Sequence, residues 1–366
     1  MTDRLAVVLP HLDALVSFDT RNPPRAIATR GIFDYLRAQL PDFECQVVDH
    51  GAGAVSMLAV RGAPRRVFNV HLDTVPSSPA WSADPLRLRI CDDRAIGLGA
   101  CDIKGAAACM LAAAQSTQGD AALLFTTDEE ANDARCISAF LETHHGFAEA
   151  VIAEPTCCTA VLAHRGISSV EMEFHGTAGH ASSAQGLEAS ALHQAVRWAG
   201  RALDEVETQA HARFGGLTGL RFNIGRIEGG IKANMIAPHA LVRFGFRPLP
   251  SQSIDAVHDR WRSFATNAAS MSYRETFRGP ALPAGSGSDA EEARLKARDL
   301  ADALGLPTGN AVDFWTEAAL FSAAGLTAFV FGPGDIAQAH SADEWVALDQ
   351  LAAAADHYTR LFGASP

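Results

Sequence analysis

The chain has 366 residues, which is enough for two domains of ordinary size, each with its own hydrophobic core. Hydrophobic residues make up 48% of the chain and charged residues 20%, a balance that is typical of folded globular proteins and excludes extensive disorder. The 30 lysines and arginines are outnumbered by 42 aspartates and glutamates, and the resulting formal charge of −12 argues against a nucleic-acid partner.

The sequence offers no candidate for a membrane segment or for a disulfide framework. Acidic residues and Pro10 interrupt the apolar stretch near the start of the chain, unlike in a secretory signal peptide, so we expect a cytoplasmic protein. The most apolar run, residues 106–114, is much shorter than the roughly 20 residues that a transmembrane helix needs, so we expect no membrane partner. The seven cysteines include no C-x-x-C pair, which argues against a thiolate zinc site.

Helix-like and strand-like segments alternate in the first 155 residues. A helical spacing of apolar residues predicts a helix over residues 26–40, and the alanine-rich segment 104–116 predicts another. Short apolar runs without alternation are typical of strands that are covered on both faces of a parallel sheet, and they span residues 67–72, 121–126 and 149–153. This order predicts an α/β domain with a mostly parallel sheet covered by helices.

The pattern changes near Gly166. Residues 168–175 alternate between polar and apolar side chains, which is typical of an antiparallel strand with one face in the core and the other in water. The segments that follow predict an inserted α+β domain with an antiparallel sheet. They are a helix over 187–208, strands over 220–227 and 240–246, and a helix over 254–269.

A loop rich in glycine, proline and serine, residues 279–288, marks the return of the chain to the first domain. Beyond it we expect a helix over 290–304, a strand over 327–331 and a closing helix over 349–362. These boundaries predict one domain formed by residues 1–165 and 279–366, and an inserted domain formed by residues 166–278.

Residues that can bind metals follow the predicted strands of the first domain. They are His71, Asp73, Asp128, Glu129, Glu130, Glu154 and, after the last strand, His340. Ligands in α/β sheets bind beyond the carboxyl ends of the strands, so we expect these side chains to converge in one crevice. Histidines and carboxylates without thiolates favour Zn²⁺, Co²⁺ or Mn²⁺, and this number of acids can hold two ions.

Each of these features alone has a simpler interpretation. A single histidine after a strand is more often structural, and a D-E-E run is more often a solvated acidic face. The combination with the loop over residues 97–105, in which glycines bracket Asp102 just before a helix, favours a metal site. The same loop lacks the third glycine of a dinucleotide fingerprint, and the chain contains neither a phosphate-binding P-loop nor the G-x-S-x-G motif of serine hydrolases.

Six motifs together resemble the M20 family of metal-dependent aminoacylases and peptidases, over nearly the whole chain. They are H-L-D-T-V-P at 71–76, G-x-G-x-x-D-x-K-G at 97–105, T-D-E-E at 127–130, A-E-P-T at 153–156, G-H-A-S at 179–182, and the late His340. The resemblance implies a catalytic domain that binds zinc or cobalt, with one or two divalent ions per subunit. It implies that the inserted domain is a lid and dimerisation domain.

The resemblance also implies a role for each metal ligand. His71 and Glu154 would bind one ion, Glu130 and His340 the other, and Asp102 would bridge the two. Two further acids would act beside the ions. Asp73 would hold the imidazole of His71 by its other nitrogen, and Glu129 would be the general base that takes a proton from water and passes it to the leaving amine.

In the inserted domain, the resemblance implies that His180 reaches the active site of a partner subunit and stabilises the oxyanion, which requires a homodimer. Asn234 and Arg247 would hold the substrate, with Arg247 gripping its carboxylate. Two departures from the family pattern bear on substrate recognition. Gly245 stands where common relatives have an aspartate, and Thr316, expected to contact substrate, is followed by Glu317 where many relatives have an aspartate.

The expected reaction is metal-dependent hydrolysis of the amide of a small N-acetyl-L-amino acid, N-acetyl-L-citrulline or N-acetyl-L-ornithine, in arginine biosynthesis. Within the same family, a succinyl-diaminopimelate desuccinylase or a dipeptidase is the alternative. An alternative of another class is a non-catalytic binding protein that keeps the fold, although such a protein would be free to lose Glu129, Asp102 or His340, which are all present.

Overall fold

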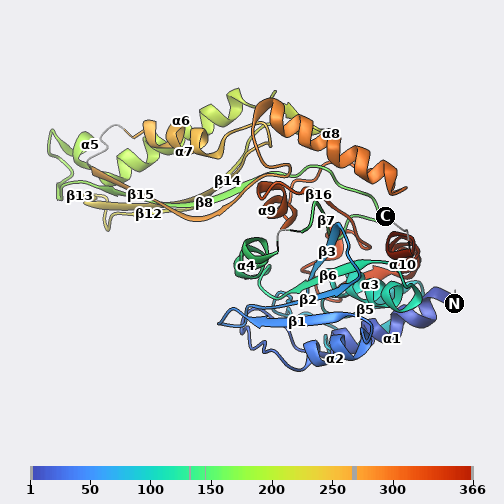
Figure 1. Cartoon of the computed structure of the whole chain (residues 1–366). Helices are drawn as coiled ribbons and strands as arrows, with labels where there is room; N and C mark the ends of the chain where they lie inside the picture. Colours follow the sequence, from blue (N-terminus) through green and yellow to red (C-terminus); the bar gives the residue numbers. More distant parts are fainter. Residues whose placement is uncertain (1–2, 132, 145, 266–269, 364–366) are drawn as a thin grey trace. The chain divides into compact units, whose positions relative to one another are not determined.

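The computed structural model describes residues 3–131, 133–144, 146–265 and 270–363. The chain divides into two compact units, which we call unit 1 and unit 2 (Figure 1). Unit 1 is formed by Met1–Leu162, Arg294–Gly309 and Thr316–Pro366, and unit 2 by Ala163–Ala293 and Asn310–Trp315. No helix within the described residues is long and apolar enough to span a membrane.

Unit 1 is built on a mixed sheet with the strand order β1-β2-β6-β3-β7-β16. Strand β3 pairs in parallel with β6 and with β7, and β7 pairs in parallel with β16, whereas β2 is antiparallel to both of its neighbours. The strands span Glu44–Asp49 (β1), Val55–Arg61 (β2), Arg66–His71 (β3), Ala121–Thr126 (β6), Glu149–Ile152 (β7) and Thr327–Val330 (β16). The predicted α/β fold class with a mostly parallel central sheet is confirmed.

The alanine-rich helix α3 (Lys104–Ser116) forms the centre of the unit 1 core. Its residues from Lys104 to Ala114 are all buried, and it packs between α1 (Asp3–Ser17) and α10 (Leu348–Gly363) and against β3. Small alanine side chains allow this close approach of several elements around one helix. Helix α9 (Ala318–Ala323) packs on β7 and β16, and α4 (Arg135–Thr143) packs against α9.

A small sheet joins two segments that are distant in sequence. Strand β5 (Arg94–Ile96) pairs with β17 (Trp345–Ala347) and with β4 (Arg89–Cys91). This pairing continues beyond the strands, since the N–H of Gly97 donates to the carbonyl oxygen of Glu344 at 3.0 Å. The loop that begins at Gly97 is therefore fixed beside the chain at Glu344.

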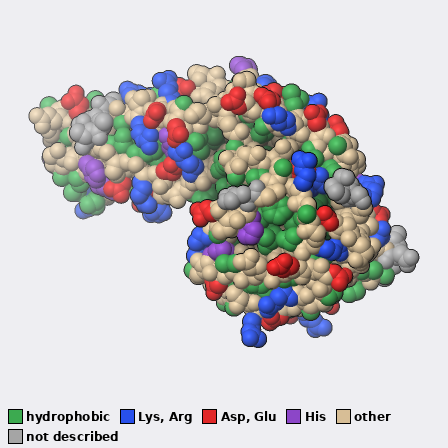
Figure 2. Space-filling model, in the orientation of Figure 1, with side chains coloured by type: hydrophobic (Ala, Val, Ile, Leu, Met, Phe, Trp, Pro, Cys, Tyr) green, Lys and Arg blue, Asp and Glu red, His purple; other side chains and the backbone are tan. Residues whose placement is uncertain are grey.

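Unit 2 contains an antiparallel sheet with the strand order β12-β14-β8-β15. Figure 1 shows helices α6 and α7 on one face of this sheet. Aromatic side chains fill the space between the sheet and these helices, with Trp198 and Trp261 almost wholly buried. The strands are Ile167–His175 (β8), Arg221–Gly229 (β12), His239–Arg247 (β14) and Met271–Gly279 (β15), and the helices are Ala191–Thr208 (α6) and Ile254–Ser263 (α7). Basic and acidic side chains are intermixed on the visible surface of unit 2 (Figure 2).

Shorter elements complete the two units. In unit 2 they are β9 (Gly179–His180), α5 (Gly186–Ala189), β10 (Arg213–Phe214), β11 (Leu217–Thr218) and β13 (Met235–Ile236). Helix α2 (Ile32–Gln39) and the 3₁₀ helix η2 (Ile336–Gln338) belong to unit 1. Helix α8 (Gly287–Ala303) begins in unit 2 and ends in unit 1.

Several predicted elements differ in extent from the observed ones. The helix expected over 26–40 starts only at Ile32, after a turn with two prolines and with Gly31 at a φ of 68°. The helix expected over 187–208 is interrupted at Ser190, whose hydroxyl caps α6 by accepting from the N–H of His193. The helix expected over 254–269 ends at Ser263, and residues 266–269 lie outside the described residues.

The boundaries between the two units differ from the domain boundaries expected from the sequence. The expected boundaries fell after residue 165 and before residue 279, whereas the two units meet after Leu162 and before Arg294, and residues 310–315 also belong to unit 2. Strand β15 and the β1–β2 hairpin have no counterpart among the predicted elements.

Candidate metal centre

The topology of unit 1 brings the predicted metal ligands to one edge of its sheet. His71 is the last residue of β3, Glu154 follows β7 after one intervening residue, and Glu130 follows β6 in a short loop. Asp102 comes from the loop before α3, and His340 from the segment after η2. Because β3, β6 and β7 run in parallel, their carboxyl ends open on the same crevice.

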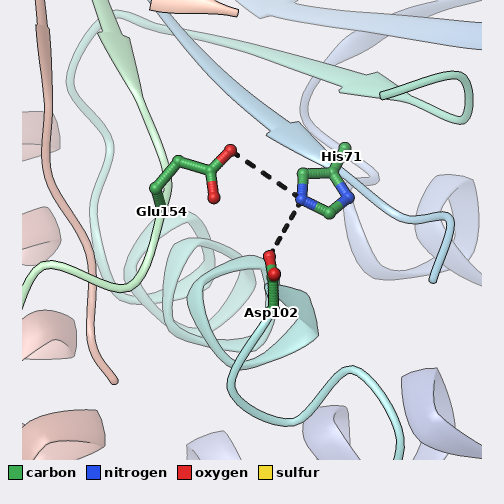
Figure 3. A group of neighbouring side chains, drawn as sticks. All are labelled: His71, Asp102 and Glu154. Atoms are coloured by element: carbon green, nitrogen blue, oxygen red, sulfur yellow. Dashed lines mark hydrogen bonds and ion pairs between the residues drawn. The ribbon is translucent and has the colours of Figure 1, made fainter. Parts of the chain in front are cut away.

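The ligand atoms form two groups that share Asp102. In the first group, Nε2 of His71 lies 3.1 Å from Oδ1 of Asp102 and 3.9 Å from Oε1 of Glu154 (Figure 3). In the second, Nε2 of His340 lies 2.9 Å from Oε1 of Glu130 and 3.3 Å from Oδ2 of Asp102. Among the described residues, the candidate ligand atoms of each group all lie within 4.8 Å of one another. Asp102 thus presents one carboxylate oxygen to each group, as a bridging ligand would.

The centre is buried and rich in negative charge. His71, Asp102 and Glu154 expose 2%, 6% and 4% of their surface, respectively. Burial and the negative charge of Asp102 raise the pKa of Glu154 well above its usual range. Burial would lower the pKa of His71, but the carboxylates of Asp102 and Asp73 outweigh it and raise this pKa. Hydrogen bonds to Asp102 and Glu130 raise the pKa of His340 to about 10.

These shifts share one cause, which is a shortage of positive charge among close carboxylates. Bound divalent cations would supply that charge. Nitrogen and oxygen donors without thiolate suit a divalent ion such as Zn²⁺ or Co²⁺. The residues present therefore fit one or two divalent cations.

Asp73 supports the centre through several contacts. Nδ1 of His71 donates to the carbonyl oxygen of Asp73 at 3.0 Å, while the nearer carboxylate oxygen of Asp73 lies 3.6 Å away. The other carboxylate oxygen accepts from the side-chain amide of Asn22 at 3.1 Å and from the N–H of Glu130 at 3.0 Å. Asp73 therefore links the ends of two neighbouring strands. Asn22 was not singled out in the sequence, although its Asn-Pro-Pro setting marks a turn.

Glu344 holds the loop that carries Asp102. Its carboxylate accepts hydrogen bonds from the backbone N–H groups of Gly99, Cys101 and Asp102, at 3.2, 2.9 and 3.0 Å. Glu344 exposes 1% of its surface, and burial together with the nearby Asp102 raises its pKa to about 7, against the effect of the three hydrogen bonds. Sequence reasoning missed Glu344, because a residue that acts on backbone N–H groups leaves no spacing pattern.

Lys104 also contacts this loop, since its backbone N–H donates to the carbonyl oxygen of Gly99 at 2.7 Å. Its ammonium group is fully buried and donates to the carbonyl oxygen of Phe18 at 3.0 Å, and burial lowers its pKa to about 7. Its side-chain stem lies 3.1 Å from the position that a Cβ at Gly99 would take, where the backbone has a φ of 77°. Glycine is therefore required at this turn both for its backbone conformation and for space.

Glu129 differs from its neighbour Glu130. Its carboxylate has no hydrogen-bond partner within the described part of the chain, whereas that of Glu130 contacts His340. Burial raises the pKa of Glu129 to about 8, with Glu130, Asp102 and Asp73 contributing and the positive charge of His71 opposing. A buried carboxyl group that makes no hydrogen bond within the described residues and has a raised pKa is suited to proton transfer.

Four further residues were predicted for the site, and none of them belongs to the two ligand groups. His180 and Asn234 are neighbours in unit 2, where β9 pairs with β13 and the N–H of Ala181 donates to the carbonyl oxygen of Asn234. Arg247 ends β14, also in unit 2. Thr316 is in unit 1 and is fully buried, and its hydroxyl accepts from the N–H of Ala318 at 3.2 Å.

Comparison with known proteins shows the family of this chain. The sequence profile of Peptidase family M20/M25/M40 matches residues 67–364. The chain belongs to this family. It is 65% identical over 366 residues to N-acetyl-L-citrulline deacetylase of Xanthomonas campestris pv. campestris, covering 100% of both chains. It is 32% identical to acetylornithine deacetylase of Myxococcus xanthus, covering 96% of this chain and 95% of that protein.

A solved structure supports the fold. The aminopeptidase PepT from Bacillus cereus matches with a TM-score of 0.74 and 18% identity, covering 98% of each chain. The family resemblance and the fold expected from the sequence are both confirmed by these matches.

The three hydrogen bonds to Glu344 predict that its carboxylate is needed for metal binding. In Glu344→Gln the amide nitrogen would face backbone donors, so the loop with Asp102 should shift. We expect affinity for Zn²⁺ to fall about 10- to 100-fold, measured by competition with a chromophoric chelator. Asp343→Asn is the matched control, because Asp343 contacts Ser82 and Arg89 instead. Equal affinities in the two variants would contradict the assigned role.

Proposed function

We propose that this protein hydrolyses the amide bond of N-acetyl-L-citrulline, releasing acetate and L-citrulline in arginine biosynthesis, with N-acetyl-L-ornithine as the alternative substrate. The observation that carries the reaction type is the free carboxylate of Glu129 beside two ligand groups that share Asp102. The choice of substrate is supported by the name of the relative that is 65% identical over the full length. The acetylornithine deacetylase at 32% identity supports the alternative.

We assign each ligand to a metal position. His71 and Glu154 would hold one ion, Glu130 and His340 a second, and Asp102 both, with zinc or cobalt as the metal. A divalent ion bound there supplies Lewis acidity, which polarises the acyl carbonyl and lowers the pKa of water. Asp73 would keep the Nδ1 of His71 occupied as a donor, so that Nε2 remains the ligand atom.

Glu129 would move the proton of the reaction. It accepts a proton from the attacking water as the new C–O bond forms at the acyl carbon. As the C–N bond breaks, it delivers the same proton to the departing nitrogen of the amino acid. One water is consumed, and acetate and the free amine are the products.

His180 is proposed to stabilise the oxyanion across a homodimer, in the active site of the partner subunit. Its side chain is exposed, and its Nδ1 lies 2.7 Å from the hydroxyl of Ser182 and 3.3 Å from the N–H of the same residue. In the neutral tautomer in which Nδ1 accepts from these two donors, the proton is on Nε2. That N–H is then free to donate to a developing oxyanion. Asn234 and Arg247 are proposed to bind the substrate, with Arg247 on its carboxylate. The expected contact of Thr316 with substrate is not retained, because its side chain is fully buried and its hydroxyl caps the N–H of Ala318.

The first test compares substrates directly. Protein loaded with Zn²⁺ or Co²⁺ should release acetate from N-acetyl-L-citrulline, and more slowly from N-acetyl-L-ornithine. Acetate is measured enzymatically, with chelator-treated protein as the control. Release from neither substrate by the metal-loaded protein would overturn the proposal. Succinyl-diaminopimelate and dipeptides would then test for the alternative hydrolases, and inactivity on all of them would favour a binding protein.

The role of Glu129 predicts a separation of activity from metal content. Glu129→Gln should keep its metal and lose turnover by at least about 100-fold, the scale for removal of a general base. Metal content is measured by atomic emission and turnover by acetate release. Glu142→Gln, at an exposed position on α4, is the matched control. Loss of metal together with activity would show that Glu129 is a ligand instead.

The shared site predicts complementation between two inactive variants. When His180→Ala and Glu129→Gln subunits are mixed and allowed to exchange, one site of each hybrid dimer is intact, so activity should recover to at most about a quarter of the wild-type value. Each variant alone is the control. No recovery, despite subunit exchange demonstrated by native mass spectrometry, would rule out a contribution of His180 across the dimer.

A further inference from the structure

The open face of the unit 2 sheet contains a hollow of about 690 Å³. Residues from all strands of this sheet line it, and helices α6 and α7 cover the opposite face (Figure 1). Phe244 and Phe246 also line the hollow, but their side chains are buried in the core on the other face of the sheet. The hollow is therefore bounded by the outward-facing side chains of the strands and by their backbone.

The hollow exists because one row of the sheet has short side chains. The strand register places Asn223, Gly245 and Ser169 side by side, and Thr276 lies on the adjoining edge strand. Successive outward-facing residues of a strand are two positions apart, so longer side chains stand on either side of this row. Arg221 pairs with Arg247 on one side.

Glu171 lies on the other side of the short row, between Arg243 and Arg274. Its carboxylate is the acidic group that lines the hollow within the described residues, and it is already occupied by two ion pairs. Arg243 contacts it at 2.8 Å, and Arg274 contacts it from the next strand. It therefore has little capacity left to bind a further cation.

The guanidinium groups around the hollow are less completely neutralised. Arg221, Arg243 and Arg247 all line it. Nη1 of Arg247 is buried and has no hydrogen-bond partner among the described residues. Asp313 lies 3.6 Å from Arg221, but it is shared with the fully buried Arg165, which also donates to the carbonyl oxygen of Arg247. The guanidinium groups of Arg221, Arg243 and Arg247 thus leave the hollow with an excess of positive charge.

We infer that this hollow, where Arg247 is already proposed to hold the substrate's carboxylate, reads the substrate's side chain over the row at Gly245, accepting a neutral ureido group and excluding an ammonium group. The inference rests on the proposed function and names the part of unit 2 that distinguishes N-acetyl-L-citrulline from N-acetyl-L-ornithine. A ureido group needs paired donors and acceptors, which Asn223 and Ser169 supply. An ammonium group needs a free carboxylate or an aromatic face, and it is repelled by guanidinium groups.

The geometry of the strand fits a substrate of this size. Positions 245 and 247 are two residues apart on β14, which corresponds to about 6.8 Å along a strand. A side chain of three methylene groups and a ureido group spans a similar length from the carboxylate. Carboxylate and ureido group can therefore be bound by adjacent rows of one rigid strand.

The decisive test places a negative charge in the short row. A Cβ at Gly245 would come no closer than 3.4 Å to its nearest neighbour, the carbonyl oxygen of Ser168, so a side chain fits there. In Gly245→Asp the ratio of kcat/KM for N-acetyl-L-citrulline over N-acetyl-L-ornithine should fall about tenfold or more, because the new carboxylate attracts the ammonium group. Gly245→Asn, of the same size but neutral, is the matched control.

Two further measurements test the inference at a second position and without catalysis. Asn223→Asp adds a carboxylate to the same row without changing the size of an exposed side chain on the edge strand, and it should shift the ratio in the same direction. Affinities of both compounds for the Glu129→Gln protein, measured by calorimetry, should show the same preference without turnover.

The outcomes separate this inference from the proposed function. An active enzyme whose preference is unchanged in both aspartate variants would overturn the inference and leave the proposed function intact. Absence of acetate release by the wild-type protein would overturn the proposed function. Calorimetry on the wild-type protein would then still decide the inference, since equal affinity for the two compounds, or no binding of either, would refute it.

Discussion

The constraint on which the rest of unit 1 depends is the repulsion among carboxylates that are buried together at the end of its sheet. Asp102, Glu130 and Glu154 lie within contact distance of two imidazoles, with Glu129 beside them. Such a group is stable only when positive charge is bound and when the backbone prevents the side chains from turning away. Parallel strands give the first layer of rigidity, since they end at a common edge and bring His71, Glu130 and Glu154 to it.

The residues that hold the ligands are themselves largely acidic, which makes the centre dependent on protons as well as on metal. Glu344 and Asp73 hold backbone N–H groups, and the buried Glu317 has its pKa raised by burial and by Asp128 and Glu129. Burial also raises the pKa of Asp128 to about 6. A cation that binds here displaces protons from the acidic groups whose pKa is raised. Metal affinity therefore depends on pH through these neighbouring acids as well as through the ligands themselves.

The strands that could be predicted from the sequence are those whose own residues form a recognisable apolar pattern. Strands β3, β6 and β7 are continuous apolar runs that end in metal-binding residues, so both strand and ligand could be placed. Strand β15 was missed because Glu275 interrupts the apolar side of its alternation and a bulge between Glu275 and Phe277 shifts its register. Asn22 and Glu344 were missed for a different reason, since single contacts to a carboxylate or to backbone N–H groups depend on which loops meet and have no sequence period.

The two units differ in how freely their functional residues can change. Each ligand in unit 1 is coupled to others through shared oxygens, so a substitution alters the charge balance of the whole centre. In the short row of unit 2, Asn223 and Gly245 have outward positions on a sheet whose core is formed by its other face. Substitutions there change the charge and shape of the hollow at little cost in stability. A sheet with one covered and one open face therefore allows recognition to diverge while the chemistry of the metal centre stays fixed.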